Sequence, residues 1–185
     1  MILDEKRILM RKLCRQFAEN EFTDELLDRL EKTGEFDWNI FRKMSRYGFT
    51  GVKIPTEYGG QGGDSLDYVI MVEEFARKSA VLSLYANTSN SLGAGPLLIC
   101  GNDEQKKKYL GDVANGKKIM IFCLTEPGAG SDAGGTITTA TPEGEYFILN
   151  GRKTFASGAP IADYAVVLAK TDTTKHGSKG ISMFI

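Results

Sequence analysis

The chain has 185 residues, of which 42% are hydrophobic and 25% are charged, a composition ordinary for a soluble globular protein of one domain or two small ones. Its 23 Lys and Arg residues nearly balance its 24 Asp and Glu residues, which leaves a net charge of −1. Global charge therefore gives no indication of a nucleic-acid or membrane-surface partner, and no stretch approaches the roughly 20 apolar residues of a membrane span.

The N-terminus and the cysteines predict a cytoplasmic protein. Residues 1–7, MILDEKR, lack the apolar core of a signal peptide and are too acidic for a transit peptide. Cys14, Cys100 and Cys123 lie far apart and show no C-x-x-C spacing. We therefore expect free thiols in a reducing compartment.

Residues 1–116 show the apolar periodicity of helices, and we predict an all-helical N-terminal domain there. The opening helix carries one apolar stripe, made of Leu9, Met10, Leu13, Cys14 and Phe17. Further helices begin where a short polar side chain can accept a backbone hydrogen bond. The expected N-caps are Thr23 or Asp24, Asp37, and Asp64 or Ser65, and a charged helix starts at residues 102–104. Glycines end helices at Gly34, Gly48 and Gly116.

Two segments of this helical region leave alternatives open. Residues 81–100 are apolar, rich in small residues and nearly free of charge, so we expect them at the centre of the bundle or against another subunit. The glycine-rich loop that ends at residue 63 can follow a tight path. It is either a connector, the interpretation we favour, or one wall of an active site.

After Lys117, short β-rich runs separated by turn signals replace the helical period, and Asn150-Gly151 is the strongest hairpin signal. The runs are residues 136–141, 146–149, 153–156, 164–169 and 181–185. We predict an α+β fold in which the N-terminal all-helical bundle precedes an incomplete antiparallel β-sheet or barrel at residues 117–185. The last run stops inside a strand, so we expect this second domain to be truncated.

The stretch FCLTEPGAGSD at residues 122–132 joins an apolar strand to a tight polar turn. Gly128 and Gly130 can take positive φ and let the backbone approach a ligand. Thr125 and Ser131 offer hydroxyls, and the loop offers free amides. This chemistry suits an anion or the edge of a planar heteroaromatic group, although a β-turn without a ligand has the same composition.

Residues 128–133 also match G-x-G-x-x-A, which is close to a dinucleotide-binding fingerprint. That fingerprint lies between a strand and a helix. Here it is followed by two glycines and the β-rich run Thr136–Thr139, without a helical period. We therefore exclude a Rossmann site.

Four segments, in the expected order, resemble signatures of the acyl-CoA dehydrogenase family. They are PTEYGGQG at residues 55–62, GNDEQKKKYL at 101–110, FCLTEPGAGSD at 122–132 and NGRKTFAS at 150–157. The resemblance runs nearly end to end, but it covers only about the N-terminal half of a family member. It implies a helical domain followed by the first part of a middle β domain, with the family's C-terminal helical domain absent.

The resemblance implies FAD-dependent α,β-dehydrogenation of an acyl-CoA thioester, in fatty acid metabolism, by a homo-oligomer (tetramer or dimer) that passes electrons to an electron-transfer flavoprotein. A glutamate takes the α-proton and the flavin takes the β-hydride. Because that glutamate lies in the family's C-terminal domain, we expect no catalytic residue in this chain. The alternatives are an oxidase or monooxygenase on the same fold, and a non-catalytic helical interaction module.

The match also implies which residues bind the flavin, and Ser131 is additionally expected to contact the substrate. The expected cofactor-binding residues are Phe122, Cys123, Leu124, Thr125, Gly130, Ser131, Phe155, Ala156 and Ser157. Phe155 would pack its ring against the isoalloxazine, and Ser157 would place a hydroxyl near N5. The family's common Ile-Thr-Asn is replaced here by residues 156–158, Ala-Ser-Gly, which removes bulk beside the flavin.

Three residues also have a structural interpretation. Without the resemblance, Phe155 would be an ordinary core aromatic. Glu126 lies beside Pro127 in the turn, and we expect it to support the turn rather than to act as the base. His176 is the only histidine and has no carboxylate cluster around it in the sequence, so we expect no metal site.

Overall fold

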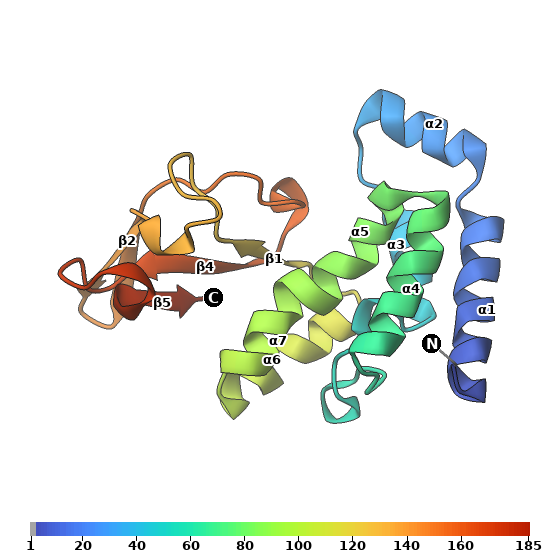
Figure 1. Cartoon of the computed structure of the whole chain (residues 1–185), viewed down its shortest axis with the longest axis horizontal. Helices are drawn as coiled ribbons and strands as arrows, with labels where there is room; N and C mark the ends of the chain where they lie inside the picture. The colour runs from blue at the N-terminus through green and yellow to red at the C-terminus, as the bar shows by residue number, and fades with distance from the viewer. Residues whose placement is uncertain (1–2) are drawn as a thin grey trace. The chain divides into compact units, whose positions relative to one another are not determined.

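The computed structural model describes residues 3–185. The chain divides into two compact units, Met1–Ile119 and Met120–Ile185. The first unit is built from helices and the second from a β-sheet, as the colours along the chain show in Figure 1. The predicted fold class, helices followed by a sheet, is confirmed.

Local capping signals set the helix boundaries of the first unit. Its α-helices are α1 Glu5–Glu21, α2 Asp24–Thr33, α3 Trp38–Arg46, α4 Ser65–Lys78, α5 Ala80–Asn87, α6 Ala94–Cys100 and α7 Asp103–Ala114. The side chains of Thr23, Asp37 and Asp64 accept hydrogen bonds from amides in the first turns of α2, α3 and α4. Gly34 ends α2 with φ of 65°, and Gly48 follows α3 with φ of 78°. These predicted caps are confirmed.

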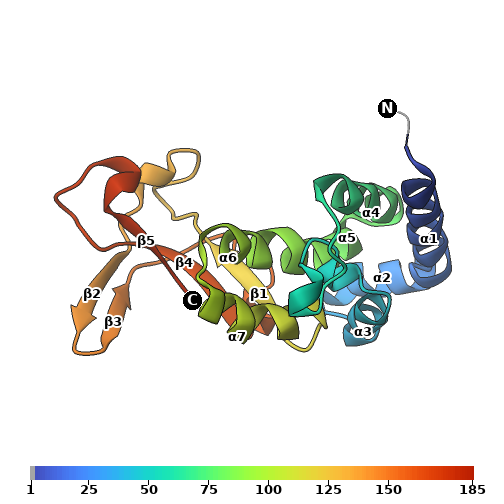
Figure 2. The same ribbon diagram turned by 90° about the horizontal axis from the view of Figure 1, so that it is seen from below.

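The core of the helical unit is aromatic. Phe17 of α1 contacts Phe75 of α4, with ring centroids 5.6 Å apart, and Phe49 lies 5.0 Å from both. Edge-to-face and offset pairs of this kind add about 0.5–1.5 kcal/mol each beyond the burial of the rings. The cluster holds α1 beside α4, and the two helices lie side by side in Figures 1 and 2.

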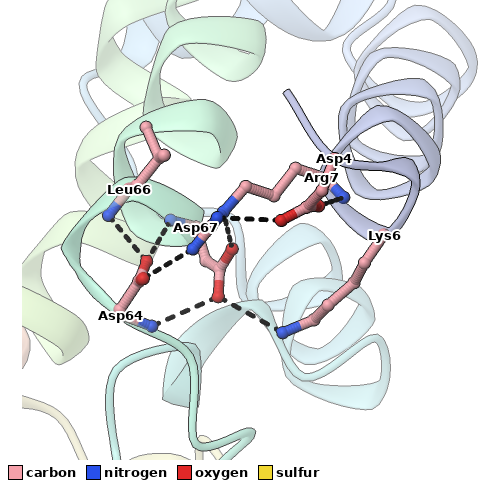
Figure 3. Close-up of polar contacts among 6 residues, drawn as sticks. All are labelled: Asp4, Lys6, Arg7, Asp64, Leu66 and Asp67. Atoms are coloured by element: carbon pink, nitrogen blue, oxygen red, sulfur yellow. Dashed lines mark hydrogen bonds and ion pairs between the residues drawn. The ribbon is translucent and has the colours of Figure 1, made fainter. Parts of the chain in front are cut away.

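Ion pairs join the same two helices at their N-terminal ends (Figure 3). Arg7 of α1 donates to Asp67 of α4 at 3.0 Å and to Asp64, the N-cap of α4, at 2.6 Å. Its third partner is Asp4, the N-cap of α1, at 2.9 Å. Because the Asp67 side chain is only 4% exposed, Arg7 supplies the counter-charge that a buried carboxylate needs.

Residues 81–100 are less buried than their composition suggests. Between α5 and α6 the chain forms a π-helical segment, Thr88–Gly93, whose Asn90 is buried and donates to Phe49 O at 2.6 Å. Val81, Leu84 and Ile99, in contrast, are 58%, 42% and 84% exposed. The segment thus buries one face, which includes Leu82, Ala86 and Leu97, and is not buried all round. Contact of the exposed apolar face with another subunit stays a prediction.

The glycine-rich loop that precedes α4 is folded back on the preceding backbone. Gly62 N donates to Ile54 O at 2.9 Å and Gly63 N donates to Val52 O at 2.8 Å. A Cβ at Gly60 would lie 2.0 Å from Ile54 O, so this approach needs a glycine. The glycines thus serve the packing of the loop as a connector within the helical unit.

The second unit contains one five-stranded sheet. Its strands are β1 Met120–Cys123, β2 Thr139–Glu143, β3 Tyr146–Asn150, β4 Tyr164–Lys170 and β5 Ile181–Phe184. The order is β1-β4-β2-β3, with β5 also paired to β4. β4 runs parallel to β1, beside it in Figure 2, and parallel to β2, whereas β2–β3 and β4–β5 are antiparallel.

The sheet is therefore mixed, and the prediction of an antiparallel sheet is wrong in this respect. Short turns between β-rich runs suggest hairpins, which are antiparallel. Only β2–β3 and β4–β5 are such neighbours in the chain. β1 and β4 are separated by a long connection that contains β2 and β3, and a connection of this length allows a parallel pair.

The β2–β3 hairpin turns at residues 144–145, so the hairpin expected at residues 150–151 is also wrong. Gly144 has φ of 60°, as the first position of a two-residue hairpin loop requires. Gly151 follows β3 and serves a different purpose. A Cβ at Gly151 would lie 2.2 Å from Thr138 Oγ1, so the glycine permits a close approach.

Candidate functional site

The two segments expected to bind a flavin lie next to each other in the β unit. The first runs from β1 into a turn at residues 122–131. The second, residues 153–157, belongs to no strand, contrary to the strand predicted at residues 153–156. One backbone hydrogen bond to the first segment and side-chain contacts hold it instead of a ladder. In that bond Thr154 N donates to Thr125 O at 2.8 Å. Folding thus brings both predicted segments together.

A tight turn after β1 leaves its glycine backbone open on one side. Glu126 N donates to Ala129 O at 2.9 Å, and Ala129 N donates to Glu126 O at 3.1 Å. Gly128 and Gly130 do not take the positive φ that their sequence context suggests. A Cβ at either glycine would nevertheless meet nothing within 4 Å, and Gly130 and Ser131 are exposed. The turn can therefore be approached closely by another molecule.

Phe155 combines a strained backbone with an exposed ring. Its φ is 56°, the one positive value at a non-glycine position within residues 3–185, and it is 92% exposed. The left-handed region costs an L-residue about 1–2 kcal/mol, and a bulky side chain is rare there. The interpretation as a core aromatic is therefore wrong. Strain of this kind is typical of ligand sites.

A buried ion pair links the two segments. Lys153 Nζ lies 2.7 Å from Glu126 Oε1, and the two side chains are 10% and 1% exposed. Lys153 Nζ also donates to Leu124 O and to Thr136 Oγ1, each at 3.0 Å. Every hydrogen of the ammonium group thus has an acceptor.

The Glu126 carboxylate accepts four hydrogen bonds. Oε1 accepts from Lys153, from the Thr136 hydroxyl and from Thr138 N, and Oε2 accepts from Ile137 N at 2.7 Å. Burial alone would raise the pKa of Glu126, but these hydrogen bonds outweigh it and hold the pKa well below its ordinary value. Glu126 is consequently an ionised support of the turn and a poor proton acceptor.

The flavin implied by the resemblance fits most of the residues present. The exposed ring of Phe155, the exposed Ser131 and Ser157, and the open glycine backbone suit a planar, polar-edged group. Thr154 Oγ1 is buried and has no partner within the described residues. Cys123 departs from the prediction, since it is 9% exposed and burial raises the pKa of its thiol, so its side chain packs inside the unit. The remaining candidates, Phe122, Leu124, Thr125 and Ala156, are half-buried.

Lys153 and Thr136 are the residues that sequence reasoning missed. Lys153 lies 27 positions from Glu126, and nothing local connects the two. The available signal was a lysine within a β-rich run in one candidate segment and a glutamate within the turn of the other. Opposite charges in two segments expected to meet predict an ion pair when both sites are buried.

Other site chemistries find no support in the described residues. His176 is exposed in the loop before β5. Across residues 3–185, no group of three or more His, Cys, Asp or Glu side chains is placed to hold a metal ion. Over the same range, no helix has both the length and the apolar character needed to cross a membrane.

Comparison with known proteins matches both units to one family. Residues 4–117 match the acyl-CoA dehydrogenase N-terminal domain, and residues 121–185 match the acyl-CoA dehydrogenase middle domain. The chain is 55% identical, over all 185 residues, to the caffeyl-CoA reductase-Etf complex subunit CarC of Acetobacterium woodii. It is 52% identical, over the same length, to a 3-(aryl)acrylate reductase of Clostridium sporogenes.

The chain covers 48% of each of these two relatives, so it spans about half their length. Among solved structures, it resembles an acyl-CoA dehydrogenase complexed with FAD from Bacillus anthracis, with a TM-score of 0.83 and 35% identity. That match covers 91% of this chain and 29% of the other. The chain belongs to the acyl-CoA dehydrogenase family.

Proposed function

We propose that this chain is the N-terminal half of an FAD-dependent oxidoreductase that dehydrogenates an acyl-CoA thioester between Cα and Cβ and passes the electrons to an electron-transfer flavoprotein. The observation that carries the proposal is the exposed, strained Phe155 beside a turn with an open glycine backbone. Membership of both units in the acyl-CoA dehydrogenase family supports it. So does the FAD named for the Bacillus anthracis structure.

The residues of this chain would bind and orient the cofactor. Bound FAD would supply the acceptor for the β-hydride. We assign the ring of Phe155 to a face of the isoalloxazine and Thr125 to its pyrimidine edge. Ser157 would place its hydroxyl near N5, and Ser131 would bind a phosphate or the acyl-CoA tail. Further contacts are assigned to Phe122, Leu124, Gly130 and Ala156, and to the backbone of Cys123.

The base that takes the α-proton lies, in this proposal, outside residues 1–185. Glu126 is the carboxylate nearest to the turn in sequence, but both of its oxygens accept hydrogen bonds and its pKa is lowered. A general base needs a pKa close to the working pH and a free lone pair toward the substrate. Glu126 lacks the first property, and its side chain is only 1% exposed, so it presents no oxygen to a substrate.

A second candidate function is the reverse reaction on an aryl substrate. Two relatives above 50% identity are named as reductases, one of caffeyl-CoA and one of 3-(aryl)acrylates. Adding a hydride at Cβ and a proton at Cα of an unsaturated acyl group reverses the dehydrogenation. The same flavin site serves both directions, and the electron partner decides which one runs.

Anaerobic flavin spectra of the complete gene product test these proposals. A dehydrogenase should lose its flavin absorption on addition of a saturated acyl-CoA. A reductase should regain flavin absorption when its reduced form meets an aryl-acrylyl-CoA. Rapid recovery in air, without a protein acceptor, would instead support the oxidase alternative. A colourless gene product that takes up no FAD would overturn the proposed function.

The partners follow from the same comparison. The name of the Acetobacterium woodii relative includes an Etf complex, which supports an electron-transfer flavoprotein as partner. We further propose a cytoplasmic homo-oligomer, a tetramer or a dimer, that acts in fatty acid metabolism. Light scattering of the complete gene product alone measures its oligomeric state. Light scattering of its mixture with the electron-transfer flavoprotein measures the association of the two proteins.

A further inference from the structure

The Glu126–Lys153 pair lies next to the residues proposed to contact the flavin. Lys153 precedes Phe155 by two positions, and its ammonium group reaches the first segment at Leu124 O, 3.0 Å away, and at Glu126, 2.7 Å away. Glu126 in turn accepts from the amides of Ile137 and Thr138. One pair thus ties three separate stretches of the chain together.

Stability alone does not account for such a pair. Removing two charges from water is costly, and well-packed apolar replacements are often as stable. What the pair provides is a defined position. Each N–H of Lys153 meets a different acceptor, on Leu124, Glu126 and Thr136, so the ammonium has one well-determined place.

The Phe155 backbone needs a restraint of this kind. A free chain would relax from φ of 56° toward negative φ. Residues 151–156 belong to no strand, so a sheet ladder does not hold them. Ala156 O accepts from Ala159 N at 3.1 Å within the same segment. The restraints that join the residues around Phe155 to other stretches of the chain are the bond from Thr154 N to Thr125 O and the three bonds of Lys153.

We propose that Glu126 and Lys153 are positioning residues, which hold residues 154–157 against Thr125 in the conformation that presents the Phe155 ring and the Ser157 hydroxyl to the flavin. Neither residue touches the reacting atoms. The functional part of this inference rests on the proposed flavin site. The structural part, the restraint on residues 154–157, stands without it.

The test compares Lys153→Met with Lys153→Arg in the complete gene product. The first readout is hydrogen exchange at residues 154–157 of the apoprotein, and the second is the FAD dissociation constant from a fluorescence titration. In Lys153→Met, which removes all three bonds of the ammonium group, we expect exchange to be faster by about tenfold. FAD should bind about tenfold more weakly, because residues 154–157 must then be ordered on binding. Lys153→Arg should restore part of the exchange protection and part of the FAD affinity, because it keeps the charge and the donors.

A matched control removes a similar pair from the helical unit. Arg15 Nε lies 2.8 Å from Glu74 Oε2, and the Glu74 side chain is 2% exposed. Arg15→Met should lower the melting temperature but leave exchange at residues 154–157 and FAD affinity within about twofold of wild type. Thr136→Val is the milder variant if Lys153→Met does not fold. It removes one acceptor of Lys153 and should move both readouts in the same direction.

The two readouts separate this inference from the proposed function. Variants at positions 153 and 136 that only lower the melting temperature, as Arg15→Met does, would overturn the positioning role. Faster exchange at residues 154–157 in a protein that binds no FAD would support the restraint and refute the proposed function. Unchanged exchange together with weaker FAD binding would refute the restraint and leave the flavin site supported.

Discussion

Replacing Phe155 with glycine should stabilise the apoprotein although it removes a large aromatic side chain. Phe155 has φ of 56° and is 92% exposed. Glycine takes this φ without the clash of Cβ against the backbone. Because the ring is almost fully exposed, its removal reduces the buried apolar surface very little.

The magnitude follows from two opposing terms. The left-handed conformation costs an L-residue about 1–2 kcal/mol, and glycine removes this cost. The greater conformational freedom of glycine in the unfolded chain offsets roughly 0.5–1 kcal/mol of this gain. The net gain for Phe155→Gly is therefore between about 0 and 1.5 kcal/mol. Phe155→Ala is the matched control, because it loses the ring but keeps Cβ and its strain.

The assay is urea unfolding of the apo form of wild type and both variants, with the FAD dissociation constant measured for each. We expect Phe155→Gly to unfold at a higher urea concentration than Phe155→Ala, and Phe155→Ala to remain close to wild type. Both variants should bind FAD more weakly, since they lack the ring that we propose to stack on the flavin. A glycine variant that is less stable than the alanine variant would refute the argument from backbone strain.

Three further predictions concern other buried contacts. Glu126→Gln should lower the free energy of unfolding in urea at pH 7 by about 3–5 kcal/mol, because it leaves the Lys153 ammonium buried without its counter-charge. In wild type the contribution of Glu126 is complete above the pKa of the unfolded carboxyl, near 4.5, and is lost as the pH falls, because its folded pKa is lowered. Gly151→Ala should lower stability by about 1–3 kcal/mol in the same assay, since its methyl group would lie 2.2 Å from Thr138 Oγ1. Arg7→Ala should lower the melting temperature, since the buried Asp67 carboxylate would keep Lys6, at 3.4 Å, as its cationic partner and the Asp64 amide as a neutral donor.

Each of these predictions has a control and a contradicting outcome. Glu126→Gln should destabilise less at pH 3 than at pH 7, and an equal effect at both would contradict the lowered pKa. Gly128→Ala, with no neighbour within 4 Å of its Cβ, should leave stability unchanged, and equal losses at positions 128 and 151 would argue against the clash. Lys6→Ala, whose side chain is 75% exposed, should hardly change the melting temperature. An Arg7→Ala variant with the same melting temperature as Lys6→Ala would show that the buried Asp67 carboxylate does not need its ion pair with Arg7.

Much of the helical unit could be predicted because its signals are local. An N-cap side chain bonds an amide two or three residues away, as Thr23 does with Leu26 N and Asp37 with Ile40 N. A C-terminal glycine such as Gly34 acts through its own φ. The change from a helical to a β period near residue 117 is equally visible in the sequence. The two segments proposed to bind the flavin were found by their resemblance to known motifs.

The arrangement of the β unit depended on contacts between distant residues. The parallel pairing of β1 with β4 joins strands about 40 positions apart, Met120 with Tyr164 for example, and the sequence of neither strand specifies its partner or direction. Glu126 and Lys153 meet only because that sheet brings their loops together. The φ of Phe155 is likewise set by its surroundings, since a phenylalanine by itself prefers negative φ. The sequence alone determined the helical unit, the caps at Thr23, Asp37 and Asp64, and the family, because these are encoded by neighbouring residues. Only the tertiary structure decided the strand order, the buried pair and the exposed, strained aromatic, because each is the product of long-range packing.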